Sequence, residues 1–293
     1  MRLSLENVTY AYPTSGPERL RTAVDGVSLE LAAGATLGVM GRTGSGKSTL
    51  LELLAGVTRP AGGRVLADGV DVWESHAARR ALAVARGLVF QRPERQFFEV
   101  TVEDELVAGL RGRGLSRGER RERATEALGL VGLDLGAIGS RSPLTLSGGQ
   151  QRRVAIASVL VLRPSVLLLD EPTAGLDPAA RCACLDAVRA CAAAGVTVVM
   201  ASHDADAVAR TCENVLVMDA GRAVLRGSSR ELLGNADLMR KHGLDGCLPA
   251  RAASALAQAG VNVGDGILSA EELADAIARV AAATAAARGE AAR

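Results

Sequence analysis

Short runs of apolar residues, separated by turns rich in glycine and acidic residues, predict a series of strands in residues 1–228. Near the N-terminus, residues 3–10 and 27–31 alternate apolar and polar positions, which is typical of antiparallel strands with one solvated face. Four later runs are apolar throughout, at residues 36–40, 87–90, 166–169 and 196–200. Continuous apolar runs indicate strands that are buried on both faces, as in a parallel sheet. The pattern therefore predicts a parallel sheet that an antiparallel β element precedes.

The stretches between these runs predict turns and helices. Two further pairs of short runs flank the dipeptides Asp68-Gly69 and Ala220-Gly221, and each pair predicts a hairpin. Helical periodicity with dense charge extends over residues 102–133, where Ser116 and Glu119 form a capping-box pattern. Strands that alternate with helices, with polar loops at the strand ends, predict a parallel α/β core.

The pattern changes after residue 228. Residues 229–293 contain no strand-like run and show two helical patterns. The second pattern begins with a capping box from Ser269 to Glu272, and its period places Leu273, Ile277 and Val280 on one face. We therefore expect a domain over residues 1–228, with a helical subdomain at about 92–160, and a C-terminal helical segment over residues 229–293.

Composition excludes several classes of protein. Aromatic residues make up only 2% of the chain, which argues against a single-strand nucleic-acid binder, because such proteins stack bases on aromatic rings. The 34 basic and 33 acidic residues nearly balance, so no overall field attracts nucleic acid or lipid. We expect no nucleic-acid partner. No apolar run approaches the roughly 20 residues of a membrane span, so we expect a soluble, cytosolic chain.

The cysteines and the N-terminus agree with that compartment. None of the five cysteines forms a Cys-x-x-Cys pair, so the sequence suggests neither a zinc site nor a redox motif. We expect them to be small buried hydrophobic residues in a reducing environment. Residues 1–6 alternate like a strand and contain no signal-peptide core.

The strongest chemical signal is a glycine-rich turn between the apolar run at 36–40 and a helical pattern that starts at Leu50. It matches the phosphate-loop pattern G-x-x-x-x-G-K-[ST]. Such a turn presents backbone N–H groups and a helix N-terminus to an anion. Lys47 adds a positive charge for the phosphates, and the Ser48 hydroxyl can ligate Mg²⁺. The expected nucleotide-binding residues are Gly41, Arg42, Thr43, Gly44, Ser45, Gly46, Lys47, Ser48 and Thr49.

Polar residues with catalytic potential follow other apolar runs. Asp170 ends the run at 166–169, a position from which a carboxylate can hold Mg²⁺. Because side chains alternate at a strand end, the next residue, Glu171, points the other way and can activate water as a general base. The pair could also be surface charge, but the buried leucines before it argue against that. His203 follows another run and could contact a phosphate, although a lone histidine is more often structural.

Taken together, these motifs resemble the ABC-transporter ATPases over about residues 1–228. By that resemblance, their order in the chain is the Walker A loop (41–49), the Q-loop (Gln91), the family signature (146–150), Walker B (167–171), the D-loop (175–177) and the H-loop (His203). The resemblance implies a P-loop ABC nucleotide-binding domain: an α/β fold with a RecA-like parallel sheet core, an antiparallel β subdomain and a helical subdomain, followed here by the C-terminal helical extension. It also implies hydrolysis of ATP with Mg²⁺.

The resemblance assigns roles to individual residues. It makes Glu171, His203 and Gln91 catalytic, and it places Mg²⁺ at Ser48, Gln91 and Asp170. Tyr12 looks like the aromatic residue that stacks on adenine, although a structural role at a strand end stays open. In this family the signature meets the ATP that the opposite subunit binds, so one copy of each motif implies a head-to-tail dimer. The residues that it adds to nucleotide binding are Ser147, Gly148, Gly149, Gln150 and Asp177.

One group within the family is the most similar. Phe90 to Phe98, followed by Thr101-Val102-Glu103-Asp104, resembles the energy-coupling factor (ECF) ATPases, which often carry Q-x-P-E-x-Q-[LF]-F here. Residues 243–277 resemble their C-terminal segment. The chain departs from that group at 106–109, where a Phe-Gly pair is common. Thr43 and the Ala-Gly-Leu-Asp D-loop are nearer the second of the two paired ECF ATPases, so the resemblance favours a heterodimer with a second ABC ATPase.

The ECF resemblance implies an importer for a vitamin or a transition-metal ion. Its other expected partners are an integral membrane coupling subunit and a small substrate-binding membrane subunit, which would place this chain peripherally at the cytoplasmic face of the cell membrane. Phe97 and Phe98 would anchor a coupling helix, unless they form a local core. A conventional importer or exporter stays open. A non-transport ABC protein is disfavoured by the single cassette and the balanced charge.

Overall fold

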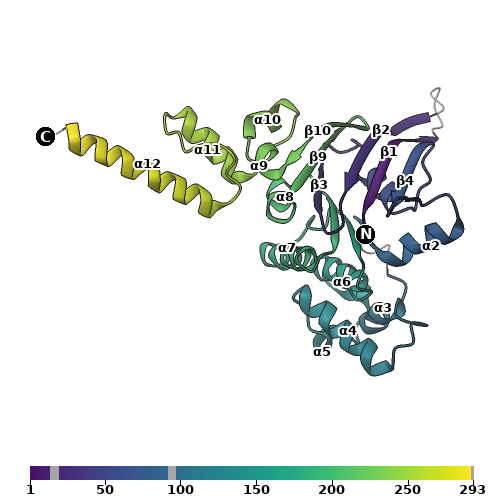
Figure 1. The fold of residues 1–293 in the computed structure, drawn as a ribbon. Helices are drawn as coiled ribbons and strands as arrows, with labels where there is room; N and C mark the ends of the chain where they lie inside the picture. The colour runs from purple at the N-terminus through teal and green to yellow at the C-terminus, as the bar shows by residue number, and fades with distance from the viewer. Residues whose placement is uncertain (14–19, 92–96, 292–293) are drawn as a thin grey trace.

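A six-stranded sheet forms the centre of the fold (Figure 1). The computed structural model of the 293-residue chain describes residues 1–13, 20–91 and 97–291. The strand order is β10-β9-β3-β8-β7-β6, and all neighbours are parallel except the β10–β9 hairpin. The bounds are β3 (Thr36–Met40), β6 (Arg86–Val89), β7 (Val166–Asp170), β8 (Thr197–Ala201), β9 (Asn214–Asp219) and β10 (Arg222–Ser228). The predicted parallel core is confirmed.

A second, four-stranded sheet is antiparallel and has the order β2-β1-β4-β5. Its strands are β1 (Leu3–Pro13), β2 (Leu20–Leu31), β4 (Gly62–Ala67) and β5 (Val70–Asp71). The turn between β4 and β5 has positive φ at Asp68 (49°) and Gly69 (86°), as the Asp-Gly dipeptide predicts. The antiparallel element is therefore present as expected.

The antiparallel sheet and helix α1 cover one face of the parallel sheet, other helices cover the opposite face, and strand alternation explains how. On β7, Val166 and Leu168 belong to one buried cluster, whereas Leu167 and Leu169 belong to another. The first cluster contains α1 (Lys47–Leu54) and the antiparallel sheet. The second contains three further helices, α6 (Gly148–Leu160), α7 (Pro178–Ala193) and α8 (Ala205–Thr211). Both faces are buried, which is why the strand sequences are apolar throughout.

The helical insert lies at one end of the parallel sheet, beside α6 (Figure 1). It contains α3 (Val102–Ala108), α4 (Arg117–Leu130), α5 (Leu135–Ile138) and a 3₁₀ turn (Pro143–Thr145). Ser116 and Glu119 form the predicted capping box of α4. One helix, α2 (His76–Ala85), has no counterpart in the sequence-based expectations. Leu82 is its only buried residue, and alanine and arginine fill most of its other positions.

Within residues 229–291, the C-terminal segment has four helices, not the two that the sequence pattern predicts. They are α9 (Ser229–Leu232), α10 (Ala236–Lys241), α11 (Leu248–Gln258) and α12 (Ala270–Ala291). The last helix extends away from the body of the molecule (Figure 1). Ala276 of α12 is buried in a small cluster, whereas Ile277 is 40% exposed, so the expected apolar face is wrong at Ile277.

The cysteines follow the expectation only in part. Cys184, Cys212 and Cys247 are buried, whereas Cys182 is exposed and Cys191 is half-buried, and all five are free thiols. Burial raises the pKa of the Cys184 and Cys212 thiols to about 12, as for inert core residues. Separately, none of the helices in the described ranges is long and apolar enough to span a membrane.

Candidate nucleotide-binding and catalytic site

The phosphate loop connects β3 to α1, and its glycines are required by space as well as by conformation. Gly41 and Gly46 have φ values of 150° and 104°. A Cβ atom at Gly46 would lie 2.1 Å from the carbonyl oxygen of Ala23, and one at Gly41 would lie 2.3 Å from that of Met218. Neither position can accept a side chain without movement of the neighbouring backbone. The loop is thus held tightly between β2 and β9.

Lys47 lies within the loop, and 8% of the residue is exposed. Its Nζ donates hydrogen bonds to the carbonyl oxygens of Gly41 (2.6 Å) and Arg42 (3.0 Å). Burial lowers the pKa of the Lys47 ammonium, and the nearby carboxylates of Glu171 and Asp170 oppose that shift. The Ser45 hydroxyl is buried and has no hydrogen-bond partner within the described ranges. A charged donor and an unpaired hydroxyl in one anion-binding loop fit a phosphate group.

A pocket of 420 Å³ opens beside this loop, a size that suits a small-molecule ligand. It brings together ten residues that the sequence predicts, namely Tyr12, Thr43, Gly44, Gly46, Lys47, Ser48, Thr49, Gln91, Asp170 and Glu171. The same lining includes Pro13, Arg21, Thr22 and Ala23, which sequence reasoning missed. Arg21 pairs with Tyr12 across β1 and β2, and both residues lie beyond the predicted strands at 3–10 and 27–31, so the expected strands carried no signal for Arg21.

Tyr12 lies at the mouth of the pocket with 39% of its surface exposed. Its hydroxyl is 3.2 Å from Thr49 Oγ1 and donates to Glu52 Oε2 at 3.4 Å, and its ring packs edge-on against Tyr10. Burial is the main cause that raises the pKa of this phenol. These contacts fix the edge of the ring that carries the hydroxyl and leave ring surface accessible in the pocket. The geometry is compatible with stacking and also with the structural role that the sequence leaves open.

Asp170 and Ser48 face each other across the pocket floor. Burial raises the pKa of the Asp170 carboxyl, and a hydrogen bond with the Ser48 side chain acts in the opposite direction. In the described parts of the chain, no group of three or more His, Cys, Asp or Glu side chains is arranged to hold a metal ion. One carboxylate and one hydroxyl fit Mg²⁺, because this ion keeps several waters and takes substrate phosphates as ligands. The donor set therefore suits Mg²⁺ that arrives with a nucleotide.

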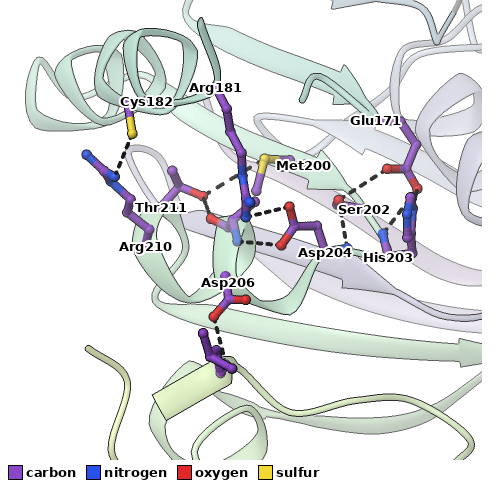
Figure 2. Close-up of polar contacts among 12 residues, drawn as sticks. Glu171, Arg181, Cys182, Met200, Ser202, His203, Asp204, Asp206, Arg210 and Thr211 are labelled. Atoms are coloured by element: carbon purple, nitrogen blue, oxygen red, sulfur yellow. Dashed lines mark hydrogen bonds and ion pairs between the residues drawn. The ribbon is translucent and has the colours of Figure 1, made fainter. Parts of the chain in front are cut away.

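Glu171 is 7% exposed and holds the H-loop through both carboxylate oxygens (Figure 2). Its Oε1 accepts a hydrogen bond from the His203 backbone N–H (3.1 Å) and lies 2.8 Å from His203 Nδ1. Its Oε2 accepts from the Ser202 hydroxyl at 3.2 Å. The residue has φ = 48°, so a left-handed turn and not the alternation of strand β7 sets the direction of its side chain. Figure 2 shows the histidine ring beside the carboxylate.

The signature residues form the start of α6 and do not line the pocket. Ser147 accepts from the Gln150 N–H at 3.3 Å, and Gln150 Oε1 accepts from the Ser147 N–H at 3.1 Å. Ser147 and Gly148 are exposed. Asp177 is also exposed and caps α7 by accepting from the Ala180 N–H at 2.9 Å. The expected nucleotide contacts thus fall into two groups, one in the pocket and one on the surface.

The loop after Gln91 is described only in part. Gln91 is exposed and lines the pocket, whereas residues 92–96, which carry much of the ECF-like motif, lie outside the described residues. Phe97 packs against the main core cluster, and Phe98 is 75% exposed. The two phenylalanines therefore have different surroundings. Glu105 accepts hydrogen bonds from the backbone N–H groups of Phe98 (3.0 Å) and Glu99 (2.9 Å) and so fixes the backbone here.

The fold and the pocket together define an ATPase of the P-loop class with an ABC signature. Residues 24–174 match the family model described as ABC transporter, and the chain belongs to this family. An energy-coupling factor transporter ATP-binding protein EcfA2 from Symbiobacterium thermophilum is 41% identical over 282 residues, which are 96% of this chain and 97% of that protein. The protein with the same description from Clostridium tetani is 36% identical over 273 residues (93% and 94%). Within the family, the chain belongs to the ECF transporter ATP-binding proteins.

Solved structures agree with this assignment. The structure of cbiO1 from Clostridium perfringens, described as part of the ABC transporter complex cbiONQ, has a TM-score of 0.69 at 34% identity and covers 82% of this chain and 93% of that one. An ATP-binding cassette solved as a dimer with ADP and Pi has a TM-score of 0.71 at 29% identity, with coverage of 78% and 98%. The predicted fold class and the ATPase activity are confirmed.

Proposed function

We propose that this chain supplies the ATP-driven step of an ECF-type membrane importer, as one half of an ATPase pair. The observation that carries the proposal is the placement of Glu171, which lines the phosphate-loop pocket together with Lys47 and Asp170. A vitamin or a transition-metal ion is the cargo class that the resemblance to ECF ATPases implies. The relatives span nearly the same length as this chain, which supports transfer of the whole subunit's role.

Within the pocket, each side chain has a distinct task. The loop N–H groups and the Lys47 ammonium bind the β- and γ-phosphates of ATP. Ser48, Asp170 and Gln91 are the residues that would hold Mg²⁺, which supplies charge neutralisation at the phosphates when it is bound. Glu171 accepts the proton of the water whose oxygen attacks the γ-phosphorus, while the bond from that phosphorus to ADP breaks. His203 holds the Glu171 carboxylate in place through its ring nitrogen.

The exposed signature implies that a second ATPase chain completes each site. Ser147, Gly148, Gly149 and Gln150, with Asp177, would meet the nucleotide of the partner chain. Binding of ATP would then close the pair, and hydrolysis would reopen it. The paired ECF relatives, of EcfA2 type (41% identical) and EcfA1 type (40% identical), support a heterodimer.

The experiment that tests this role is the substitution Glu171→Gln in this chain, purified together with its partner ATPase. Loss of the base should lower steady-state phosphate release by roughly 10²–10⁴-fold, whereas ATP affinity measured by calorimetry should stay within about twofold. The variant should also accumulate as an ATP-bound dimer in size-exclusion chromatography. Glu213→Gln, at an exposed position before β9, is the matched control. Turnover near the parental rate in Glu171→Gln would show that Glu171 is not the base.

The link to the membrane is proposed to pass through the surface around Phe98. We propose that the chain associates peripherally with the cytoplasmic face of the cell membrane, where this aromatic residue inserts against a coupling helix of the membrane subunit. The domain over residues 1–228, with its helical subdomain at about 92–160, would carry the ATPase and this contact. The C-terminal helical segment over residues 229–293 would follow that domain.

Phe98→Ala tests that contact more cleanly than the double change with Phe97→Ala, because Phe97 also packs against the core. ATP binding by the isolated chain should be unchanged, since Phe98 does not line the pocket. Capture of the membrane subunits from native membranes in mild detergent should fall at least about tenfold, as for loss of an interface hot spot. Val57→Ala, at another exposed apolar position, is the control. Equal recovery of the membrane subunits with Phe98→Ala would rule out this contact.

A further inference from the structure

An ion pair connects the helix after the D-loop to the residue that follows His203 (Figure 2). Arg181 Nη2 of α7 lies 2.6 Å from Asp204 Oδ2, and the side chains are 35% and 24% exposed. Arg181 is one turn after Asp177, the N-cap of α7, and its N–H donates to the Asp177 carbonyl at 2.8 Å. The pair therefore joins the first turn of α7, directly after the D-loop, to the N-cap of α8, directly after His203. A pair with this partial burial is screened less than a fully exposed one.

The backbone N–H and both carboxylate oxygens of Asp204 have partners. Its Oδ1 accepts from the Ala207 N–H at 3.0 Å and so caps α8, while its own N–H donates to the Ser202 hydroxyl at 3.1 Å. Ser202 in turn donates to Glu171 Oε2. The second carboxylate oxygen of Asp204 is the one that pairs with Arg181. A displacement of Asp204 would thus be passed to both neighbours of the catalytic carboxylate.

The His203 ring depends on this backbone because packing does not hold it. Its side chain is 71% exposed, and the contact of Nδ1 with Glu171 is its polar anchor. The backbone is held before the ring by the His203 N–H, which donates to Glu171, and after the ring by the Arg181–Asp204 pair. An exposed side chain with restraints on both sides of its own residue is positioned by those restraints.

We propose that Arg181 and Asp204 are positioning residues, which hold His203 against Glu171 and so connect the D-loop to the catalytic carboxylate. This inference rests on the proposed roles of Glu171 and His203. The pair touches no part of the nucleotide pocket, so its loss should slow the chemical step without weakening nucleotide binding. A shift of a positioned base away from its productive geometry costs a large part of its rate effect.

The test is Arg181→Gln, with Arg189→Gln as the matched control. Arg189 lies on the same helix and makes an exposed ion pair with Asp186 at 3.9 Å. We expect kcat for ATP hydrolysis to fall about tenfold in Arg181→Gln, since part of a 10²–10⁴-fold base effect is lost. KM, ATP affinity and the midpoint of thermal unfolding should match those of Arg189→Gln. Arg181→Lys, which keeps the charge, should recover most of kcat.

A second variant separates the ion pair from the helix cap. Asp204→Asn keeps an oxygen that can accept from the Ala207 N–H, but it removes the charge that Arg181 binds. It should lower kcat to the same extent as Arg181→Gln, and the double variant should be no slower than either single one. Equal kcat in Arg181→Gln and Arg189→Gln would overturn the proposal. So would a common fall in kcat, ATP affinity and thermal stability, because that result describes a structural role alone.

Failure of the proposed function would give a different set of results from failure of the positioning role. If Glu171→Gln still turns over ATP, the base assignment fails, whatever Arg181 does. If Glu171→Gln is inactive while Arg181→Gln is as fast as its control, only the positioning role fails. The two outcomes come from the same phosphate-release assay on purified chains and are therefore directly comparable.

Discussion

Helices α1 and α6 both begin at a glycine-rich turn, and they differ in what satisfies their first N–H groups. The N-cap of α1 is Gly46, which has no side chain to accept a hydrogen bond. The N-cap of α6 is Ser147, which forms a capping box with Gln150. The first turn of α1 therefore keeps its donors for a ligand, whereas α6 uses one of them within its own chain.

The two helix starts also differ in where they face. Lys47, at the start of α1, is buried in the wall of the nucleotide pocket, but Ser147 and Gly148 are exposed and outside it. A single chain thus contains one helix start inside the pocket and a second, exposed helix start outside it, which we propose as the anion-binding end for a partner's nucleotide. Two similar glycine-rich turns therefore play different parts: one lines the pocket of its own chain, and the other is exposed on the surface. Three substitutions test this contrast.

Gly46→Ala should have the largest effect. The new methyl group would meet the Ala23 carbonyl at 2.1 Å, in a backbone conformation that alanine disfavours. We expect a loss of at least about 2 kcal/mol in the free energy of unfolding and at least about a hundredfold loss of ATP affinity, since the loop must move. Calorimetry and thermal unfolding measure both. Gly69→Ala is the control, because Gly69 also has positive φ but a methyl group there would have no atom within 4 Å. It should lose about 1 kcal/mol and no ATP affinity.

Gly148→Ala should affect the exposed start of α6 without affecting the phosphate loop at the start of α1. No atom lies within 4 Å of the position that the methyl group would take, so stability and ATP binding by the single chain should stay unchanged. Steady-state hydrolysis should fall about tenfold or more, because the methyl group would occupy the surface that receives the partner's γ-phosphate. Phosphate release at saturating ATP checks this expectation. Parental turnover would mean that this helix end takes no part in a shared site.

Ser147→Ala should give the smallest change in this series. Loss of the N-cap costs about 1 kcal/mol, which corresponds to a fall of about 2–4 °C in the unfolding midpoint for a domain of this size. Turnover should fall severalfold as well. The control is Ser116→Ala, which removes the same capping box from α4. It should lower the midpoint by a similar amount and leave turnover unchanged, and a matching loss of turnover would assign the effect to helix stability.

Much of this contrast could be predicted from sequence, and the reason is local. The strands of the parallel sheet are apolar because both of their faces are buried, so runs such as 166–169 identify them without knowledge of their neighbours. The glycine turns are equally local. Gly41 and Gly46 have positive φ, and neighbouring backbone atoms lie too close to leave room for a side chain. The capping box at Ser116 is contained within four residues.

What sequence reasoning missed depends on contacts between distant segments. Arg21 reaches the pocket only through the register of β1 with β2. The contact of His203 with Glu171 joins residues 32 positions apart. Helix α2 was missed because alanine and arginine fill most of its positions and only Leu82 is buried. Ile277 was placed on the wrong face because Ala276, and not Ile277, packs into the small cluster that α12 forms with α11. None of these outcomes follows from a short window of sequence.

The N-terminus of helix α11 is capped by a side chain from the ATPase part of the chain. Its N-cap, Cys247, provides no side-chain acceptor, and Asp206 Oδ1 of α8 accepts from the Leu248 N–H at 2.8 Å instead. The main core cluster also extends through Leu233 and Met239 to Ala250, whereas the cluster that contacts α12 is separate. In terms of cooperative unfolding, we expect α9 to α11 to open with the ATPase core, and α12, held by its smaller cluster and by the Arg230–Glu272 ion pair, to open as a smaller unit. Packing against the nucleotide-binding part thus continues into α11, beyond the change in sequence pattern at residue 228.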